Sequence, residues 1–437
     1  MEFHLSTLLD VVAELLTAPY LGLPALITTP ELFEEMLAAL ASGSGPFAVD
    51  AERASGYRYS SRAYLIQIKR DGGGLHLIDP IPFGIDNPYF ARLNDLLQGE
   101  EVILHASTQD LPCLREVGIN PSHLFDTELA GRLIGLPRVG LGALVESLLD
   151  VALAKEHSAQ DWSIRPLPED WLNYAALDVE LLIELRNEIE KLLVEKKKLK
   201  WAEQDFASIL AAPPAPKRVD PWRRTSGVHK LKKRAQLAVV KSLWEARDDL
   251  AAHLDTSPGR VLSDAAISTI ALAAGVTPMT NKRELEKVLR PIGLRARWFE
   301  NTPRWLKAVD NALALSEDEM PPLKSKSDAL PPIKIWRERF PEKFIPLSHA
   351  KFNFALKAEE LELPVENLLT PELLRQICWR LPDPAEVEPL LLSMGARPWQ
   401  VEIAAPILIA ALGESEPLEI PELEEAAPDP TPEAAAE

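Results

Sequence analysis

The segment Phe47-Ala48-Val49-Asp50-Ala51-Glu52 decides the fold, because it places two acids within a short apolar run. The Gly45-Pro46 turn signal precedes this run, which is too short for a helix and therefore predicts a strand. Side chains alternate along a strand with a period of two, so Asp50 and Glu52 would project from the same face. Such pairs also occur on solvated strands and turns, so this pair alone does not define a site.

A third acid follows another apolar run, Val102-Ile103-Leu104, at the end of the segment from His105 to Asp110. Open sheets present their chemistry at strand ends, and we expect Asp110 at the start of the next helix. The alternative is structural, because the helix dipole stabilises an acid at a helix N-terminus.

A fourth acid lies in the helix-periodic stretch 172–182. Tyr174 and Asp178 are four residues apart, so they would be neighbours on one face of this helix. They interrupt a face that is otherwise apolar, which indicates a specific role. For the pair in isolation, a buried Tyr–Asp hydrogen bond is an equally good interpretation.

Together these segments resemble the three motifs of the DEDD exonuclease family: residues 47–52 the first, 105–110 the second, and Tyr174-x-x-x-Asp178 the third. The tyrosine is typical of the DEDDy branch. Segments 55–60, 125–130 and 161–167 resemble ribonuclease D in addition, and the resemblance covers roughly residues 24 to 205.

The resemblance implies a ribonuclease H-like α/β fold with 3′-5′ exonuclease activity. The residues support this fold independently, because 63–69 and 75–79 read as strands of a hairpin joined across Asp71-Gly72-Gly73-Gly74. This glycine run is not a phosphate-binding loop, since it lacks GxGxxG and P-loop lysine patterns and precedes a strand.

Four gathered carboxylates need compensation, because each pair about 4 Å apart repels by roughly 4 kcal/mol at an effective dielectric constant of about 20. Oxygen ligands suit Mg²⁺ or Mn²⁺, and two such ions can clamp the attacking and leaving oxygens of a phosphodiester. We therefore expect hydrolysis from the 3′ end that releases nucleoside 5′-monophosphates. Asp50, Glu52, Asp110 and Asp178 would ligate the two ions, and Tyr174 would orient the attacking water and assist its deprotonation.

With 437 residues, the chain is too long for one ordinary domain, and proline clusters indicate its joints. The predicted parts are an N-terminal extension (1–23) that could be a loosely docked helix, the exonuclease domain (24–210), a linker (211–220), an HRDC domain (221–312), a linker (313–332), a second HRDC-like helical domain (333–412) and an acidic, disordered tail (413–437).

Charge is unevenly distributed in this acidic chain, whose formal net charge is −19. Residues 1–212 carry −15 and the tail −9, whereas residues 217–310 carry +9. This basic module resembles the HRDC domain and is suited to phosphate, although a basic run can also be a solvated helix face. The candidate nucleic-acid contacts are His105, Arg223, Arg224, Lys230, Lys232, Lys233 and Arg234.

An internal repeat predicts the second helical domain. At a constant offset of 107, apolar positions and one cap recur: Leu254, Leu262, Ser263, Ile267 and Ile270 match Leu361, Leu369, Thr370, Leu374 and Ile377. Chance matching of leucines is the alternative. Trp336 would then correspond to Trp244.

The expected partner is RNA with a free 3′ end, and the resemblance to ribonuclease D implies transfer-RNA precursors. A 3′-5′ DNA exonuclease in repair and a catalytically silent RNA-binding protein are the alternatives. Cys113 and Cys378 are far apart without CxxC partners, so neither a zinc site nor a disulfide framework is indicated. We expect a cytoplasmic protein with no membrane association and no obligate protein partner.

Overall fold

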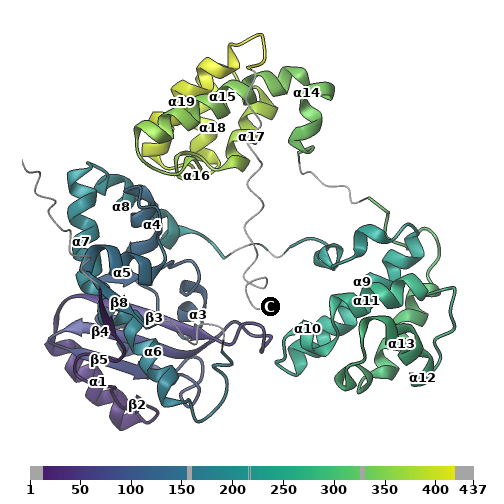
Figure 1. Cartoon of the computed structure of the whole chain (residues 1–437), viewed down its shortest axis with the longest axis horizontal. Coiled ribbons are helices and arrows are strands. Elements are labelled where there is room, and N and C mark those ends of the chain that lie inside the picture. The colour runs from purple at the N-terminus through teal and green to yellow at the C-terminus, as the bar shows by residue number, and fades with distance from the viewer. Residues whose placement is uncertain (1–12, 155–159, 215, 217, 325–329, 419–437) are drawn as a thin grey trace, which may run out of the picture.

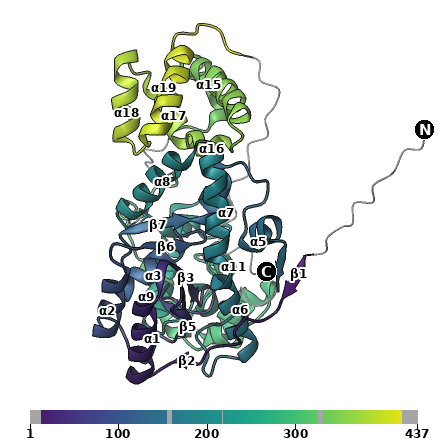
Figure 2. The same ribbon diagram turned by 90° about the vertical axis from the view of Figure 1, so that its left-hand side faces the viewer.

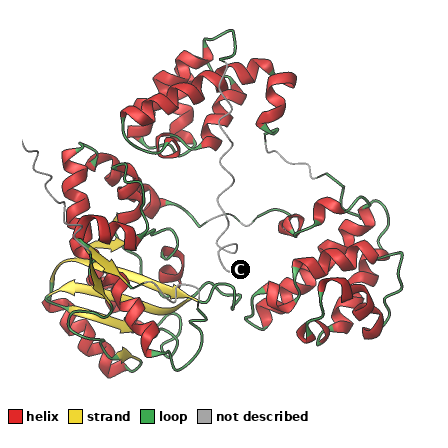
Figure 3. Ribbon diagram, viewed as in Figure 1, coloured by secondary structure: helices red, strands yellow, loops and turns green. Residues whose placement is uncertain are grey.

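The computed structural model describes residues 13–154, 160–214, 216, 218–324 and 330–418. An α/β domain comes first and two helical bundles follow it (Figure 1). Strands lie in the α/β domain, whereas the bundles consist of helices and loops (Figure 3). The predicted fold class is therefore confirmed. In the described part of the chain, no helix is long and apolar enough to cross a membrane.

A six-stranded sheet organises the α/β domain, in the order β2-β5-β4-β3-β6-β7. β3 lies inside the sheet, antiparallel to β4 and parallel to β6. β4 and β5 form the predicted hairpin, whose turn includes Gly72 at a φ of +73°, a conformation that favours glycine. The strands are β2 (Leu26–Ile27), β3 (Ser44–Arg53), β4 (Ala63–Asp71), β5 (Gly74–Ile78), β6 (Glu101–Leu104) and β7 (His123–Asp126).

Helices cover both faces of the sheet, because successive residues of β4 point to opposite faces. Ile66 and Ile68 belong to the core that contains Phe33 of α1, whereas Leu65 packs in a second cluster with Ala175 of α6. The helices of this domain are α1 (Pro30–Ser42), α2 (Pro88–Leu97), α3 (Leu111–Glu116), α4 (Thr127–Leu133), α5 (Leu141–Leu149), α6 (Glu169–Glu180), α7 (Leu182–Glu195) and α8 (Leu199–Ala211).

The beginning of the described chain is a strand, and the predicted N-terminal helix is wrong for these residues. β1 (Glu14–Leu16) pairs in parallel with β8 (Val151–Leu153), and the Ala154 N–H donates to the Leu16 carbonyl at 3.1 Å. A short leucine-rich run does not by itself distinguish helix from strand, and the unpaired edge of β8 decides the outcome. Residues 1–12 lie outside the described residues.

The first bundle has a core of its own, which contains Trp222, Trp298 and Trp305. It touches the α/β domain through polar contacts: the Ser60 N–H donates to Asp255 at 2.8 Å, and Arg260 donates to the Gly56 carbonyl at 2.7 Å. Its elements are η1 (Pro221–Arg224), η2 (Val228–Lys230), α9 (Arg234–His253), α10 (Pro258–Val261), α11 (Asp264–Ala273), α12 (Lys282–Leu289), η3 (Arg290–Ile292), η4 (Ala296–Phe299) and α13 (Thr302–Leu313).

The second bundle repeats three consecutive helices of the first. α15 (Pro341–Glu360), α16 (Val365–Leu368) and α17 (Pro371–Arg380) begin and end at the predicted constant offset from α9, α10 and α11. Ser263 and Thr370 both cap the third of these helices, accepting from the N–H three residues on. The remaining elements are η5 (Ile333–Ile335), α14 (Trp336–Arg339), η6 (Pro384–Glu386), α18 (Val387–Ser393) and α19 (Pro398–Leu412).

The predicted match of Trp336 with Trp244 is wrong. Trp244 lies in the middle of α9, whereas Trp336 is buried just before α15. Trp222 occupies the comparable place, buried just before α9. The sequence comparison failed because the loops that follow these two tryptophans differ in length.

The second bundle packs directly against the α/β domain and shares its core (Figure 2). Trp201 of α8 stacks on Trp399 of α19, with ring centroids 4.6 Å apart. The buried Lys198 ammonium donates to the carbonyls of Leu133 and Leu361, so it joins the two parts. Residues 419–437, most of the tail predicted to be disordered, lie outside the described residues.

Candidate metal centre

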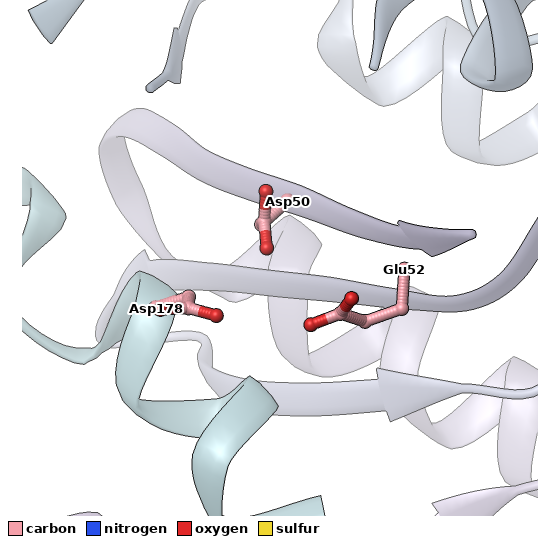
Figure 4. Close-up of side chains that lie close together, drawn as sticks. All are labelled: Asp50, Glu52 and Asp178. Atoms are coloured by element: carbon pink, nitrogen blue, oxygen red, sulfur yellow. The ribbon is translucent and has the colours of Figure 1, made fainter. Parts of the chain in front are cut away.

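β3 and α6 bring three of the predicted acids together. Asp50 and Glu52 project from one face of β3, and α6 packs on β3, β4 and β5 so that Asp178 faces them (Figure 4). One carboxylate oxygen from each of Asp50, Glu52 and Asp178 lies within 4.8 Å of the others. This distance allows the three side chains to share a cation.

Asp110 lines the same pocket but lies outside this group of three. As expected, it is the residue before α3, yet its side chain does not cap the helix. Its Oδ1 atom instead lies 3.4 Å from Nη2 of Arg53, an arginine that the sequence analysis missed. The other pocket residues are Val49, Asp50, Ala51, Glu52, Arg53, His105, Ala106, Gln109, Leu141, Tyr174, Asp178 and Leu182.

The buried Asp126 holds the loop that leads to Asp110. Its Oδ2 atom accepts from the Ser107 N–H at 2.8 Å and from the Ser107 hydroxyl at 2.6 Å. Its Oδ1 atom accepts from the Leu129 N–H at 3.0 Å and so caps α4. One carboxylate therefore fixes the end of β6 relative to α4.

Tyr174 and His105 lie beside the acids. Tyr174 is hydrogen-bonded to Asp178, one helical turn further along α6, as the spacing predicted for the alternative interpretation as well. Nδ1 of His105 lies 2.9 Å from the Thr127 hydroxyl, which orients the ring in the pocket wall. Both side chains thus have hydrogen-bond partners and also line the pocket.

Burial and mutual repulsion raise the pKa values of the clustered acids. Burial raises the pKa of Asp50 to about 6. Burial, followed by the charge of Asp50, raises the pKa values of Glu52, Asp110 and Asp178 well above their ordinary range. Burial and the nearby Asp178 also raise the pKa of Tyr174, so its hydroxyl keeps its proton near neutral pH. The cluster is therefore an unfavourable arrangement of charges without a counter-ion.

The donor set fits a hard divalent cation. Its ligands would be carboxylate oxygens, and neither histidine nor cysteine belongs to the clustered group of three. Oxygen ligands of this kind are typical of Mg²⁺ and Mn²⁺ sites rather than zinc sites. A bound dication would also remove the repulsion that raises the pKa values.

The predicted basic contacts of the first bundle divide into two groups. Arg223 and Arg234 are half-buried and donate to the carbonyls of Pro322 and Pro321, so they hold the segment that follows α13. The other four side chains are exposed and remain candidates for binding phosphate: Arg224, Lys230, Lys232 and Lys233.

The fold and the acidic site together define a class of protein, the metal-dependent 3′-5′ exonucleases. The family described as "3′-5′ exonuclease" matches residues 24–194, the "HRDC domain" family matches 236–287, and the family described as "3′ to 5′ exonuclease C-terminal domain" matches 329–412.

The ribonuclease D of Zymomonas mobilis is 32% identical over 282 residues, which cover 63% of this chain and 69% of that protein. A solved protein from Bifidobacterium adolescentis is 38% identical and aligns over 92% of this chain and 99% of its own, with a TM-score of 0.81. Escherichia coli RNase D shares the fold, with a TM-score of 0.62 and 23% identity over 89% of this chain and 98% of its own. The chain belongs to the ribonuclease D family.

Proposed function

We propose that the protein is a 3′-to-5′ exoribonuclease that uses two divalent ions, Mg²⁺ or Mn²⁺, and that transfer-RNA precursors are among its substrates. The observation that carries the proposal is the approach of Asp50, Glu52 and Asp178 to within 4.8 Å in an exonuclease fold. Membership of the ribonuclease D family supports RNA rather than DNA as the substrate.

Each side chain of the site has a definite task in this proposal. Asp50, Glu52, Asp110 and Asp178 would hold the ions, which when bound supply positive charge to the phosphate and make water more acidic. Tyr174 retains its proton, so its hydroxyl would orient the attacking water by hydrogen bonding. Arg53 would keep Asp110 turned toward the pocket.

The exposed cations of the first bundle would bind the RNA backbone. Arg224, Lys230, Lys232 and Lys233 are exposed on a module that carries a net charge of +9. Replacing the four by glutamine should weaken RNA binding and reduce the slope of log affinity against log salt by up to four contacts. Glutamine at Lys191 and Lys200, which lie on α7 and α8, is the matched control.

We infer that the second bundle, 333–412, is a diverged HRDC-like copy of the first, 221–312. The equal offset of three helices and the two equivalent caps support this. The exonuclease domain (24–210) and the linkers 211–220 and 313–332 keep their predicted bounds in this division.

The decisive experiment digests a 3′-extended transfer RNA, an unstructured RNA and a DNA of the same sequence, with products resolved nucleotide by nucleotide. We expect stepwise release of 5′-monophosphates from RNA 3′ ends, dependent on Mg²⁺ or Mn²⁺ and absent from an Asp178→Asn variant. Faster digestion of DNA would overturn the choice of substrate. Binding of RNA without digestion would instead indicate a catalytically silent protein.

A further inference from the structure

Gln67, in the middle of β4, is a buried polar residue without an evident structural task. Its side chain is 0% exposed, and among the described residues neither its amide nitrogen nor its amide oxygen has a hydrogen-bond partner. A buried amide that is left unpaired destabilises a fold, and an apolar side chain of the same size would avoid that cost. A glutamine at this position therefore indicates a polar task close by.

The sheet register places Gln67 beside the candidate metal centre. Gln67 is the direct cross-strand partner of Asp50 in the antiparallel pair of β3 and β4. Directly opposite residues project from the same face of a sheet, with Cβ atoms about 4.5–5.5 Å apart. The amide and the Asp50 carboxylate are thus neighbours on the face that α6 covers.

The neighbours of Gln67 along β4 locate it beneath α6. Leu65, two residues before it, packs with Ala175 and Ala176 of α6. Lys69, two residues after it, reaches Glu180 at the end of α6. Gln67 therefore lies under the central turns of the helix that carries Asp178, between two groups that already have partners.

We propose that Gln67 is a positioning residue of the metal centre: its side-chain N–H donates to the Asp50 carboxylate and holds it in the orientation that ligates a divalent ion. The inference rests on the proposed function, because it requires Asp50 to be a ligand. Residues that hydrogen-bond to metal-ligating carboxylates typically change metal affinity by about 10- to 100-fold when they are replaced.

The test compares Gln67→Met, which keeps the length of the side chain but removes the amide, with Leu65→Met on the same strand and face. Mn²⁺ binding to the full chain is measured by electron paramagnetic resonance, and thermal unfolding in EDTA is measured by circular dichroism. We expect Gln67→Met to melt at or above the unmutated temperature and to bind Mn²⁺ at least tenfold more weakly. Leu65→Met should leave Mn²⁺ affinity unchanged.

A second comparison tests whether Gln67 acts through Asp50. In an Asp50→Asn background, Gln67→Met should cause no further loss of Mn²⁺ affinity. An equal loss in both backgrounds, or a Gln67→Met protein that binds Mn²⁺ within threefold of the unmutated one, overturns the proposal. If the unmutated protein binds no Mn²⁺, the metal centre itself is wrong, and this outcome is distinct from a failure of Gln67 alone.

Discussion

Replacing Asp178 with asparagine should stabilise the metal-free protein and at the same time weaken its response to Mn²⁺. The change removes one negative charge from the group in which oxygens of Asp50, Glu52 and Asp178 lie within 4.8 Å of one another. The asparagine carbonyl can still accept a hydrogen bond from Tyr174, so the local packing is retained. Stability and metal binding are therefore expected to change in opposite directions.

The magnitude follows from the separation of the charges. Two unit charges at 4.8 Å repel by about 3 kcal/mol at an effective dielectric constant of about 20. Proton uptake relieves part of this repulsion, because burial raises the pKa of Asp50 to about 6. We expect a gain of about 2 kcal/mol at pH 8, which corresponds to a rise of about 4–8 °C in melting temperature for a domain of this size. The gain should be small at pH 5.

The assay is thermal unfolding followed by circular dichroism at pH 5 and pH 8, in EDTA and in Mn²⁺. Asp95→Asn is the control, because Asp95 is exposed on α2 and does not line the pocket. An Asp178→Asn protein that melts at or below the unmutated temperature in EDTA at pH 8 would refute the reasoning. So would a shift with Mn²⁺ as large as that of the unmutated protein.

Three further predictions concern pH and the supporting contacts. The metal-free protein should lose melting temperature as the pH rises from about 4 to 6: the pKa of Asp50 in the folded state, about 6, lies above its ordinary value, so its contribution to stability is lost across this window. Calorimetry in EDTA tests this, and no such loss should occur in saturating Mn²⁺. Lys198→Met removes a charged donor to the carbonyls of Leu133 and Leu361, and should reduce the free energy of unfolding by about 1.5–3 kcal/mol in urea titrations. Asp126→Asn weakens the hold on the loop that leads to Asp110, and should reduce kcat about tenfold or more in single-turnover assays.

Local periodicity was sufficient to predict the parts of the site that lie on one element. The strand period places Asp50 and Glu52 on one face, and the helix period places Tyr174 beside Asp178. Both relations depend on short-range geometry, and Figure 4 shows the two acids of β3 facing the acid of α6. The distance between strand and helix depends on packing across the sheet, and for this the family resemblance was needed.

Contacts set by strand register could not be read from the sequence. Gln67 faces Asp50 only because β4 pairs with β3 in one particular register, and two bulges interrupt that pairing. Arg53 likewise reaches Asp110 from a distant part of the chain, and no motif marks this pair as partners. The strand at residues 14–16 was missed for the same reason, since its partner β8 comes much later in the chain.

The two bundles meet the exonuclease domain through equivalent corners but with different strength. Asp255 and Glu362 occupy equivalent positions in the repeat, and both have positive φ just after the long helix of their bundle. Asp255 accepts from Ser60, and Glu362 pairs with Lys196. The second bundle also shares the main apolar core, whereas the core of the first is separate. Polar contacts without a shared core resist displacement less than buried apolar surface does, so the basic first bundle is the part that can move relative to the metal centre.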